Sequence, residues 1–228
     1  MTTPTVSLYG HWICPFATRV AFALAQRGIV HDEVEVPPSG VRPTGFVLPT
    51  EFAEHSPKLE IPMVRIGEDH LADSIPILEW LEVRIEGAPL LPDGDAARDL
   101  VRERVAWIDR HAFRGMIGVY YDTEPSLVER AADELRDALV EMDEWLADTD
   151  WLAGDEPTLA EAVSIPIYVR LDGLRRLGFS HPLPTRIRRH REQCAQLTGW
   201  AAVAWNDAQT DEFVGRLEAF RRKTRATA

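Results

Sequence analysis

The chain has 228 residues, of which 45% are hydrophobic and 27% are charged, so it can bury a core and is not an intrinsically disordered polymer. Its 37 acidic and 25 basic side chains give a formal net charge of −12, which argues against nucleic acid or an anionic membrane as the main partner. No apolar stretch approaches the ~18 residues of a membrane span, and residues 1–20 lack a secretory-signal pattern. We therefore expect a cytoplasmic protein that acts on a small molecule.

Residues 1–36 alternate strand and helix patterns. The β-prone run Val6–Tyr9 is closed by Gly10, and a helix is predicted over Phe16–Gln26. Pro15 before this helix and Gly28 after it are the expected helix punctuation. Val34 and Val36 then alternate with glutamates, which predicts a second strand.

Residues 37–50 are rich in proline and glycine and are predicted to form a loop. A hairpin follows, with strands at Met63–Ile66 and His70–Ala72, and then a helix over Ser74–Ile85. The order is β-α-β, loop, β-β-α, which predicts an α/β domain over residues 1–86.

From Asp95 onward, strand signals vanish. Residues 87–94 are predicted to be a linker, and residues 95–228 an all-α domain. Helices are predicted over residues 95–122, 126–149, 158–178, 185–198 and 210–224. Thr158 and Glu161 have the spacing of a capping box, whose expected role is structural.

The sharpest local signal is Cys14, which precedes Pro15 between the first strand and the first helix. Backbone N–H groups and the positive end of the helix dipole favour a thiolate there, and cysteine pKa values at such sites fall from about 8.5 to ~3.5–7.5. The alternative is a small buried hydrophobic residue, the commoner role of a lone cysteine. The strand-to-helix position favours the reactive thiol. The other cysteine, Cys194, is distant in sequence, so neither a disulfide framework nor a metal site is expected.

Two further motifs suggest a peptide-like ligand. Ile61-Pro62 precedes the Met63 strand, where a cis proline in thioredoxin-like folds exposes the preceding backbone to a bound peptide; an ordinary trans proline is the alternative. Asp73-Ser74 begins a helix, whose amino terminus binds carboxylates, although simple capping is the alternative. Together with Cys14, these motifs describe a site for glutathione or a close analogue.

At this point the sequence resembles the cytosolic glutathione transferase superfamily over nearly its whole length, most closely its cysteine-type, omega-like members. The matching pieces are Leu8-Tyr9-Gly10, Cys14-Pro15-Phe16 with Arg19-Val20, the run from Phe52 to Val64, Asp73-Ser74 with Ile77, and the cap Thr158–Glu161. The resemblance implies a thioredoxin-like domain followed by an all-α domain, a homodimer, and glutathione as co-substrate.

The resemblance also implies roles for individual residues. It gives Cys14 as the catalytic thiol, Ile61 as the contact to the cysteinyl backbone and Asp73-Ser74 as the γ-glutamyl site. The full set of implied glutathione-binding residues is Phe16, Lys58, Ile61, Pro62, Asp73 and Ser74. Lys58 stands where some members contact the glycyl carboxylate.

The sequence departs from the family pattern at this site. Asp73 replaces the usual glutamate, and Leu59 and Glu60 stand where glycine is frequent, so an extra carboxylate lies near the glycyl end. Because Lys58 and Lys223 are the only lysines in an arginine-rich chain, a source that uses mycothiol or another small thiol is the alternative.

The second substrate is expected between the two domains. Its pocket is predicted from side chains of both, with glycine leaving room: Tyr9, His11, Trp107, His111, Gly115 and Tyr121. Tyr9 is interpreted as a wall residue rather than a thiol activator, and His11 as a rim residue rather than a base. The aromatic helix has a plain alternative as bundle core.

The leading functional hypothesis is a glutathione-dependent thiol-disulfide oxidoreductase in which Cys14 attacks sulfur or carbon. The alternatives are conjugation or isomerisation of an electrophile, with glutathione itself as nucleophile, and a non-catalytic thiol-binding interaction module.

Overall fold

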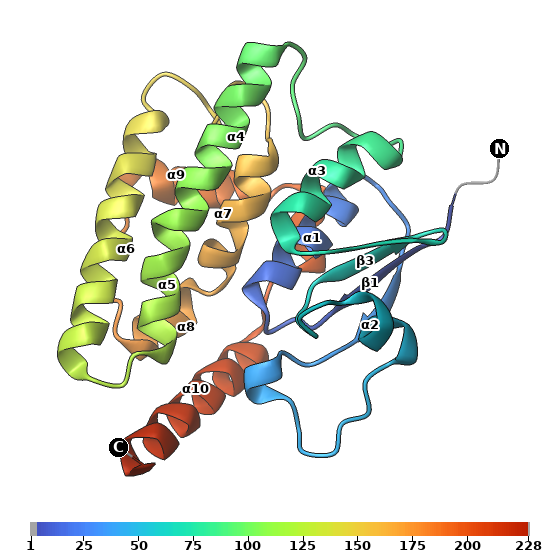
Figure 1. Cartoon of the computed structure of the whole chain (residues 1–228). Coiled ribbons are helices and arrows are strands. Elements are labelled where there is room, and N and C mark those ends of the chain that lie inside the picture. The colour runs from blue at the N-terminus through green and yellow to red at the C-terminus, as the bar shows by residue number, and fades with distance from the viewer. Residues whose placement is uncertain (1–3, 228) are drawn as a thin grey trace. The chain divides into compact units, whose positions relative to one another are not determined.

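The computed structural model describes residues 4–227, which form two compact units (Figure 1). The first unit runs to Leu91 and also takes in Leu197–Val203. The second comprises Pro92–Gln196 and the chain from Ala204 onward. The predicted combination of a mixed α/β unit and an all-helical unit is confirmed.

The first unit is built on a four-stranded sheet with the order β2-β1-β3-β4. Strand β1 (Val6–Gly10) pairs in parallel with β2 (Asp32–Glu35) and antiparallel with β3 (Met63–Ile66), which pairs antiparallel with β4 (Asp69–Ala72). The parallel pair requires a crossover, which α1 (Pro15–Gln26) supplies.

Alternation along β1 sorts its side chains between two cores. Val6 and Leu8 face an apolar cluster that includes residues of α1 and of α3 (Ser74–Arg84). Tyr9, on the opposite face, belongs to a second cluster with Cys14 and with Phe52 of α2 (Thr50–His55). One face of β1 therefore packs in the cluster that contains Cys14, and the other face packs in the apolar cluster between the sheet, α1 and α3.

The second unit is helical. Its elements are α4 (Asp95–Arg110), α5 (Ala112–Tyr121), α6 (Pro125–Trp145), α7 (Leu159–Val169), α8 (Leu171–Leu177), α9 (Thr185–Cys194) and α10 (Asp207–Thr227). Two short 3₁₀ turns, η1 (Ser39–Val41) and η2 (Thr198–Ala202), belong to the first unit. No helix in the described part of the chain is both long and apolar enough to span a membrane.

Candidate active site

Cys14 occupies the N-cap position of α1, directly before Pro15 at the first helical position. Its side chain is 6% exposed and packs within the cluster of Tyr9, Phe52 and Met63. The thiol donates a hydrogen bond to the backbone oxygen of Ile61, with a sulfur–oxygen distance of 3.9 Å, and makes no capping bond to α1. This differs from the expectation that the sulfur faces the amides of the helix, because the thiol is turned toward the segment that precedes β3.

The backbone of Ile61 is therefore a polar partner of the Cys14 sulfur. The Ile61–Pro62 peptide bond is cis, and the oxygen of Pro62 accepts a hydrogen bond from the Asp73 N–H at 3.3 Å. Asp73 has φ 83° and ψ 128°, an unusual conformation for a residue with a side chain, and its carboxylate does not cap α3. The Asp73 side chain is exposed, so it is available to a ligand.

A cavity of about 360 Å³ opens beside these residues in the first unit. It brings together all six residues expected to bind glutathione, along with four others: Phe16, Ser56, Pro57, Lys58, Glu60, Ile61, Pro62, Ala72, Asp73 and Ser74. Cys14 does not line this cavity but contacts it through Ile61. The polar lining combines one ammonium, two carboxylates, two hydroxyls and the amino-terminal end of α3.

The wall that carries Lys58 and Glu60 is held in a fixed shape. The buried Ser56 hydroxyl donates to the backbone oxygen of Glu60 at 3.0 Å, and Arg42 donates to the backbone oxygen of Leu59 at 3.0 Å. Leu59 has φ 53°, and among residues 4–227 it and Asp73 are the non-glycine residues with positive φ. Asp73 lines this cavity, and Leu59 lies in the chain between the lining residues Lys58 and Glu60. Strained backbone of this kind concentrates at functional sites.

Ser74 is a deeply buried polar side chain of the cavity wall, with 2% of its surface exposed, as is Ser56. Its hydroxyl oxygen accepts a hydrogen bond from Arg19 on α1 at 3.2 Å. Sequence reasoning matched Arg19 to the family pattern but gave it no role. The overlooked signal is an arginine five residues after Cys14, on a helix face that is otherwise apolar.

Tyr9 is committed to another partner. Its hydroxyl donates to Glu51 of α2, and burial, followed by this hydrogen bond, raises the pKa of Tyr9 to about 12. Glu51 also contacts His70, whose ring nitrogen lies 2.9 Å away, and the Tyr9 hydrogen bond is the main reason why the pKa of Glu51 is lowered. A phenol with this pKa stays protonated near neutral pH and does not supply a phenolate that could activate a thiol.

His11 also has partners at both ring nitrogens. Its Nδ1 accepts a hydrogen bond from the Ile13 N–H at 3.2 Å, and its Nε2 lies 3.7 Å from the Glu35 carboxylate. The His11 oxygen accepts from the Cys14 N–H at 3.0 Å, so this residue shapes the turn that leads into α1.

Two family models match the chain: the glutathione S-transferase N-terminal domain over residues 13–84 and the C-terminal domain over residues 95–197. The chain belongs to the glutathione S-transferase superfamily. It is a glutathione S-transferase-like enzyme, with the two-domain architecture of that superfamily.

Individual relatives are distant. The chain is 26% identical over 208 residues to a glutathione S-transferase of Arabidopsis thaliana named TCHQD, covering 73% of this chain and 77% of that one. It is 31% identical over 103 residues to a probable maleylacetoacetate isomerase 1 of Drosophila melanogaster, covering 44% and 41%. A stringent starvation protein A homolog of Coxiella burnetii is 25% identical over 170 residues, covering 74% and 77%.

Solved structures of glutathione transferases share the fold. A rice enzyme in complex with glutathione superposes with a TM-score of 0.83 at 16% identity, covering 98% of this chain and 99% of that one. Glutathione transferase Omega 3C of Trametes versicolor superposes with a TM-score of 0.77 at 18% identity, covering 94% and 91%. At these identities the structural similarity shows a shared fold and does not show a shared reaction.

In the helical unit, the residues expected to line the second-substrate pocket pack largely against other helices. Trp107 lies 4.6 Å from the His111 ring and 4.9 Å from that of Trp145 on α6, measured between centroids. Tyr121 is 41% exposed and meets the Phe220 ring edge-on at 5.3 Å. Trp107 and Tyr121 therefore pack against other aromatic rings of the helical unit, and Tyr121 is also partly exposed.

Gly115 serves close helix packing. A Cβ atom on it would lie 2.7 Å from the backbone nitrogen of Leu135 on α6. The space that its missing side chain frees is filled by α6, which corrects the expectation that this glycine leaves room for a substrate.

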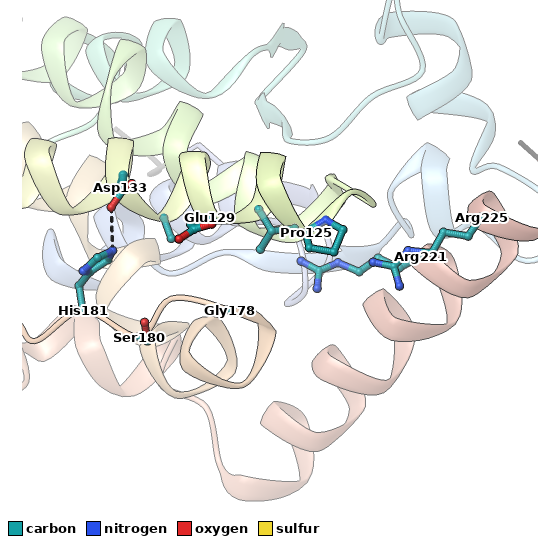
Figure 2. Close-up of a pocket in the computed structure, with 10 residues that line it drawn as sticks. Pro125, Glu129, Asp133, Gly178, Ser180, His181, Arg221 and Arg225 are labelled. Atoms are coloured by element: carbon teal, nitrogen blue, oxygen red, sulfur yellow. Dashed lines mark ion pairs between the residues drawn. The ribbon is translucent and has the colours of Figure 1, made fainter.

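A second cavity of about 360 Å³ lies in the helical unit, between α6, the segment after α8 and α10 (Figure 2). His181 points toward Asp133 on α6, with 3.1 Å between nitrogen and oxygen, and Arg221 and Arg225 approach from α10. Arg221 donates to backbone oxygens near the carboxyl ends of α5 and α8, and Arg225 to the oxygen of Thr123. These arginines anchor α10, and the cavity contains neither cysteine nor tyrosine.

Proposed function

We propose that this superfamily member is a glutathione-dependent thiol-disulfide oxidoreductase with Cys14 as its nucleophile. The observation that carries the proposal is one cavity lined by all six residues expected to bind glutathione, with the Cys14 sulfur 3.9 Å from the Ile61 oxygen at its edge. A tripeptide that pairs with the Ile61 backbone places its cysteinyl residue next to Cys14.

The donor set of the cavity fits glutathione. The Ser74 hydroxyl and the free N–H groups at the start of α3 suit the γ-glutamyl carboxylate. The exposed Asp73 carboxylate suits the γ-glutamyl ammonium, and Lys58 suits the glycyl carboxylate. Glu60 is the one lining group that opposes the ligand charge.

The proposed reaction is disulfide exchange. The Cys14 thiolate attacks the glutathionyl sulfur of a mixed disulfide, so a bond forms between Cys14 and glutathione while the second thiol leaves and takes a proton. The thiolate of another glutathione then attacks the glutathionyl sulfur on Cys14, which releases glutathione disulfide and regenerates the Cys14 thiolate. In the net reaction the second thiol of the mixed disulfide is released in reduced form, and one free glutathione is oxidised as it joins the glutathionyl unit in glutathione disulfide.

Conjugation or isomerisation with glutathione as the nucleophile is the second candidate. The observation that favours it is the Cys14 thiol itself, which is buried among apolar side chains and donates to a carbonyl instead of receiving capping N–H bonds. A thiol placed in this way can donate its proton in a hydrogen bond to the sulfur of a bound glutathione. In this second reaction, Cys14 orients the glutathione sulfur without bonding to it.

Substitutions at Cys14 separate the two reactions. We expect Cys14→Ala and Cys14→Ser to lose reduction of the mixed disulfide of glutathione and 2-mercaptoethanol by at least about 100-fold, while Cys194→Ser retains it. Undiminished disulfide reduction by Cys14→Ala would refute the leading proposal. If Cys14→Ser instead retains or gains activity toward an aryl halide, conjugation is the reaction.

Calorimetric titration addresses the remaining alternatives. Micromolar glutathione binding supports the enzyme, whereas millimolar binding without turnover indicates a non-catalytic module. Tighter binding of mycothiol than of glutathione would change the co-substrate. The proposal includes a homodimer and a cytoplasmic location, both of which rest on superfamily membership.

A further inference from the structure

Arg19 is a buried cation placed directly behind the cavity. The side chain lies on α1, is 1% exposed, and donates from Nη1 to the Ser74 oxygen at 3.2 Å. Its guanidinium carbon also lies 5.1 Å from the centroid of the Phe16 ring. Ser74 and Phe16 both line the cavity, so Arg19 contacts two of its walls without lining it.

We propose that Arg19 is a positioning residue that orients the Ser74 hydroxyl toward a carboxylate in the cavity. This inference rests on the proposed glutathione site. A serine hydroxyl has one proton to donate and two lone pairs that accept. Because the Ser74 oxygen accepts from Arg19, its proton points away from the guanidinium and is available to a ligand anion.

The positive charge of Arg19 also favours binding of a carboxylate in the cavity. A guanidinium keeps its charge at any pH at which the protein is folded, and its attraction for an anion is stronger near a buried site than in water. It adds to the positive end of the α3 dipole, where no side chain that the structure describes caps the N–H groups of Ser74 and Ile75. The cavity therefore discriminates for a ligand that carries a carboxylate at this end, such as the γ-glutamyl group.

A purely structural role makes a different prediction. Arg27, the buried arginine directly after the end of α1, also bridges to α3, through the Glu82 carboxylate and the backbone oxygen of Ile85 directly after that helix. Neither partner lines the cavity. Arg27 is thus a matched control: replacing it removes a buried α1–α3 contact without changing the polar groups behind Ser74.

The test compares two ligands on the full chain by calorimetry. One is glutathione, and the other is the analogue 4-aminobutyryl-cysteinyl-glycine, which lacks the γ-glutamyl α-carboxylate. We expect Arg19→Met to weaken glutathione binding about 10-fold and to change binding of the analogue less than about 2-fold. Arg27→Met should leave the ratio of the two affinities as it is in the unaltered protein, whatever it does to stability.

A double-mutant cycle with Ser74→Ala gives a second readout. If Arg19 acts through Ser74, the loss caused by Arg19→Met should shrink markedly when the hydroxyl is already absent. If Arg19→Met does not fold, Arg19→Lys replaces it, since that variant keeps the charge while losing the rigid fork, and it should reduce the affinity ratio partially.

An unchanged affinity ratio in a folded Arg19 variant, or an equal change in Arg27→Met, would overturn the inference while leaving the glutathione site intact. Failure of the unaltered protein to bind glutathione would overturn the proposed function, and this inference with it.

Discussion

Burial and one hydrogen bond together keep the Tyr9 hydroxyl protonated. Its hydroxyl donates to Glu51, and with a pKa of about 12 it stays protonated across the physiological range. We expect Tyr9→Phe to leave turnover within about 2-fold and to lower the free energy of unfolding by about 1–2 kcal/mol, since the bond involves a charged acceptor that is partly exposed. Turnover and urea unfolding measure the two effects. A 10-fold loss of turnover with a shifted pH profile would instead make Tyr9 a thiol activator.

The stabilising effect of this pair depends on pH in a definite direction. The pKa of Tyr9 is raised from 10.0, so its contribution is complete below pH 10 and is lost as pH rises through about 12. The pKa of Glu51 is lowered from 4.5, so its contribution is present above that pH and is lost in more acidic solution. The difference in stability between the unaltered protein and Tyr9→Phe should be flat from about pH 5 to 9 and should shrink in acid.

Glu60 is expected to limit affinity for the thiol. Its carboxylate lines the cavity beside Lys58, near the end assigned to the glycyl carboxylate. We expect Glu60→Gln to lower KM for glutathione about 3-fold with little change in kcat, because one repulsion between exposed charges is removed. Glu68→Gln, on the exposed turn between β3 and β4, is the matched control. A rise in KM would mean that Glu60 binds a cationic group of the ligand.

At the scale of elements, the sequence motif at the start of α7 proves to be one part of a larger buried network. Glu161 is fully buried; it accepts from the Leu152 N–H at 2.7 Å and from the Thr158 N–H at 2.6 Å. It also lies 3.2 Å from the ring of His190, which in turn contacts the Tyr168 hydroxyl at 2.9 Å. Glu161 therefore joins α7, α9 and the segment that precedes α7.

Substitutions at the two residues of this capping box should lower the stability by unequal amounts. We expect Thr158→Ala to cost about 1 kcal/mol and Glu161→Ala about 3–5 kcal/mol, because the second leaves several buried donors without an acceptor. Thermal unfolding measures both, with the exposed Glu156→Gln as the control, expected within about 0.5 kcal/mol of the unaltered protein. Equal costs for Thr158→Ala and Glu161→Ala would show that the wider network adds nothing.

Helix breaks were harder to predict than helices. Residues 95–122 are predicted as one helix, but α4 ends at Arg110 and α5 begins at Ala112. His111 stands between them with φ −105° and ψ −62°, a distorted right-handed α conformation. Both halves bury apolar residues, so the hydrophobic period continues across the break and gives no signal of it. Helix α2 was not predicted, since its six residues are too short to show a period and follow a proline-rich loop.

In the candidate site, too, some features could be predicted from local sequence and others depend on tertiary packing. Pro62, Asp73 and Ser74 could be found from the sequence because proline and helix starts carry local rules. The contact between Arg19 and Ser74 could not, because it joins residues 55 positions apart and depends on how α1 packs against α3. The direction of the Cys14 thiol is likewise a tertiary property, set by the Ile61 oxygen and the surrounding apolar cluster.

In the whole molecule, the fold depends on apolar patterning along most of the chain, whereas the chemistry depends on a few residues. A TM-score of 0.83 at 16% identity means that the architecture tolerates replacement of most side chains. Apolar patterning suffices for that, whereas activity depends on the few groups at one cavity. Substrate assignments for this chain therefore have to be tested at Cys14 and its neighbours.

The two cysteines of the chain, one in each unit, allow such a test on the intact protein. Cys194 is fully buried, and burial, followed by the nearby Glu161 charge, raises the pKa of its thiol well above the ordinary value. Cys14 lies beside a cavity through its contact with Ile61. Because exchange requires an accessible thiolate, incubation of the folded protein with glutathione disulfide should add one glutathione, on Cys14.

Intact mass and peptide mapping measure the product. Cys14→Ser should take up none, Cys194→Ser should take up one, and the unaltered chain in denaturant should take up two, since unfolding removes the burial that protects Cys194. An adduct on Cys194 of the folded protein, or none on Cys14, would contradict the assignment. In the second case the Ile61 carbonyl and the apolar cluster hold Cys14 as an unreactive thiol, and the nucleophile in the cavity must come from glutathione.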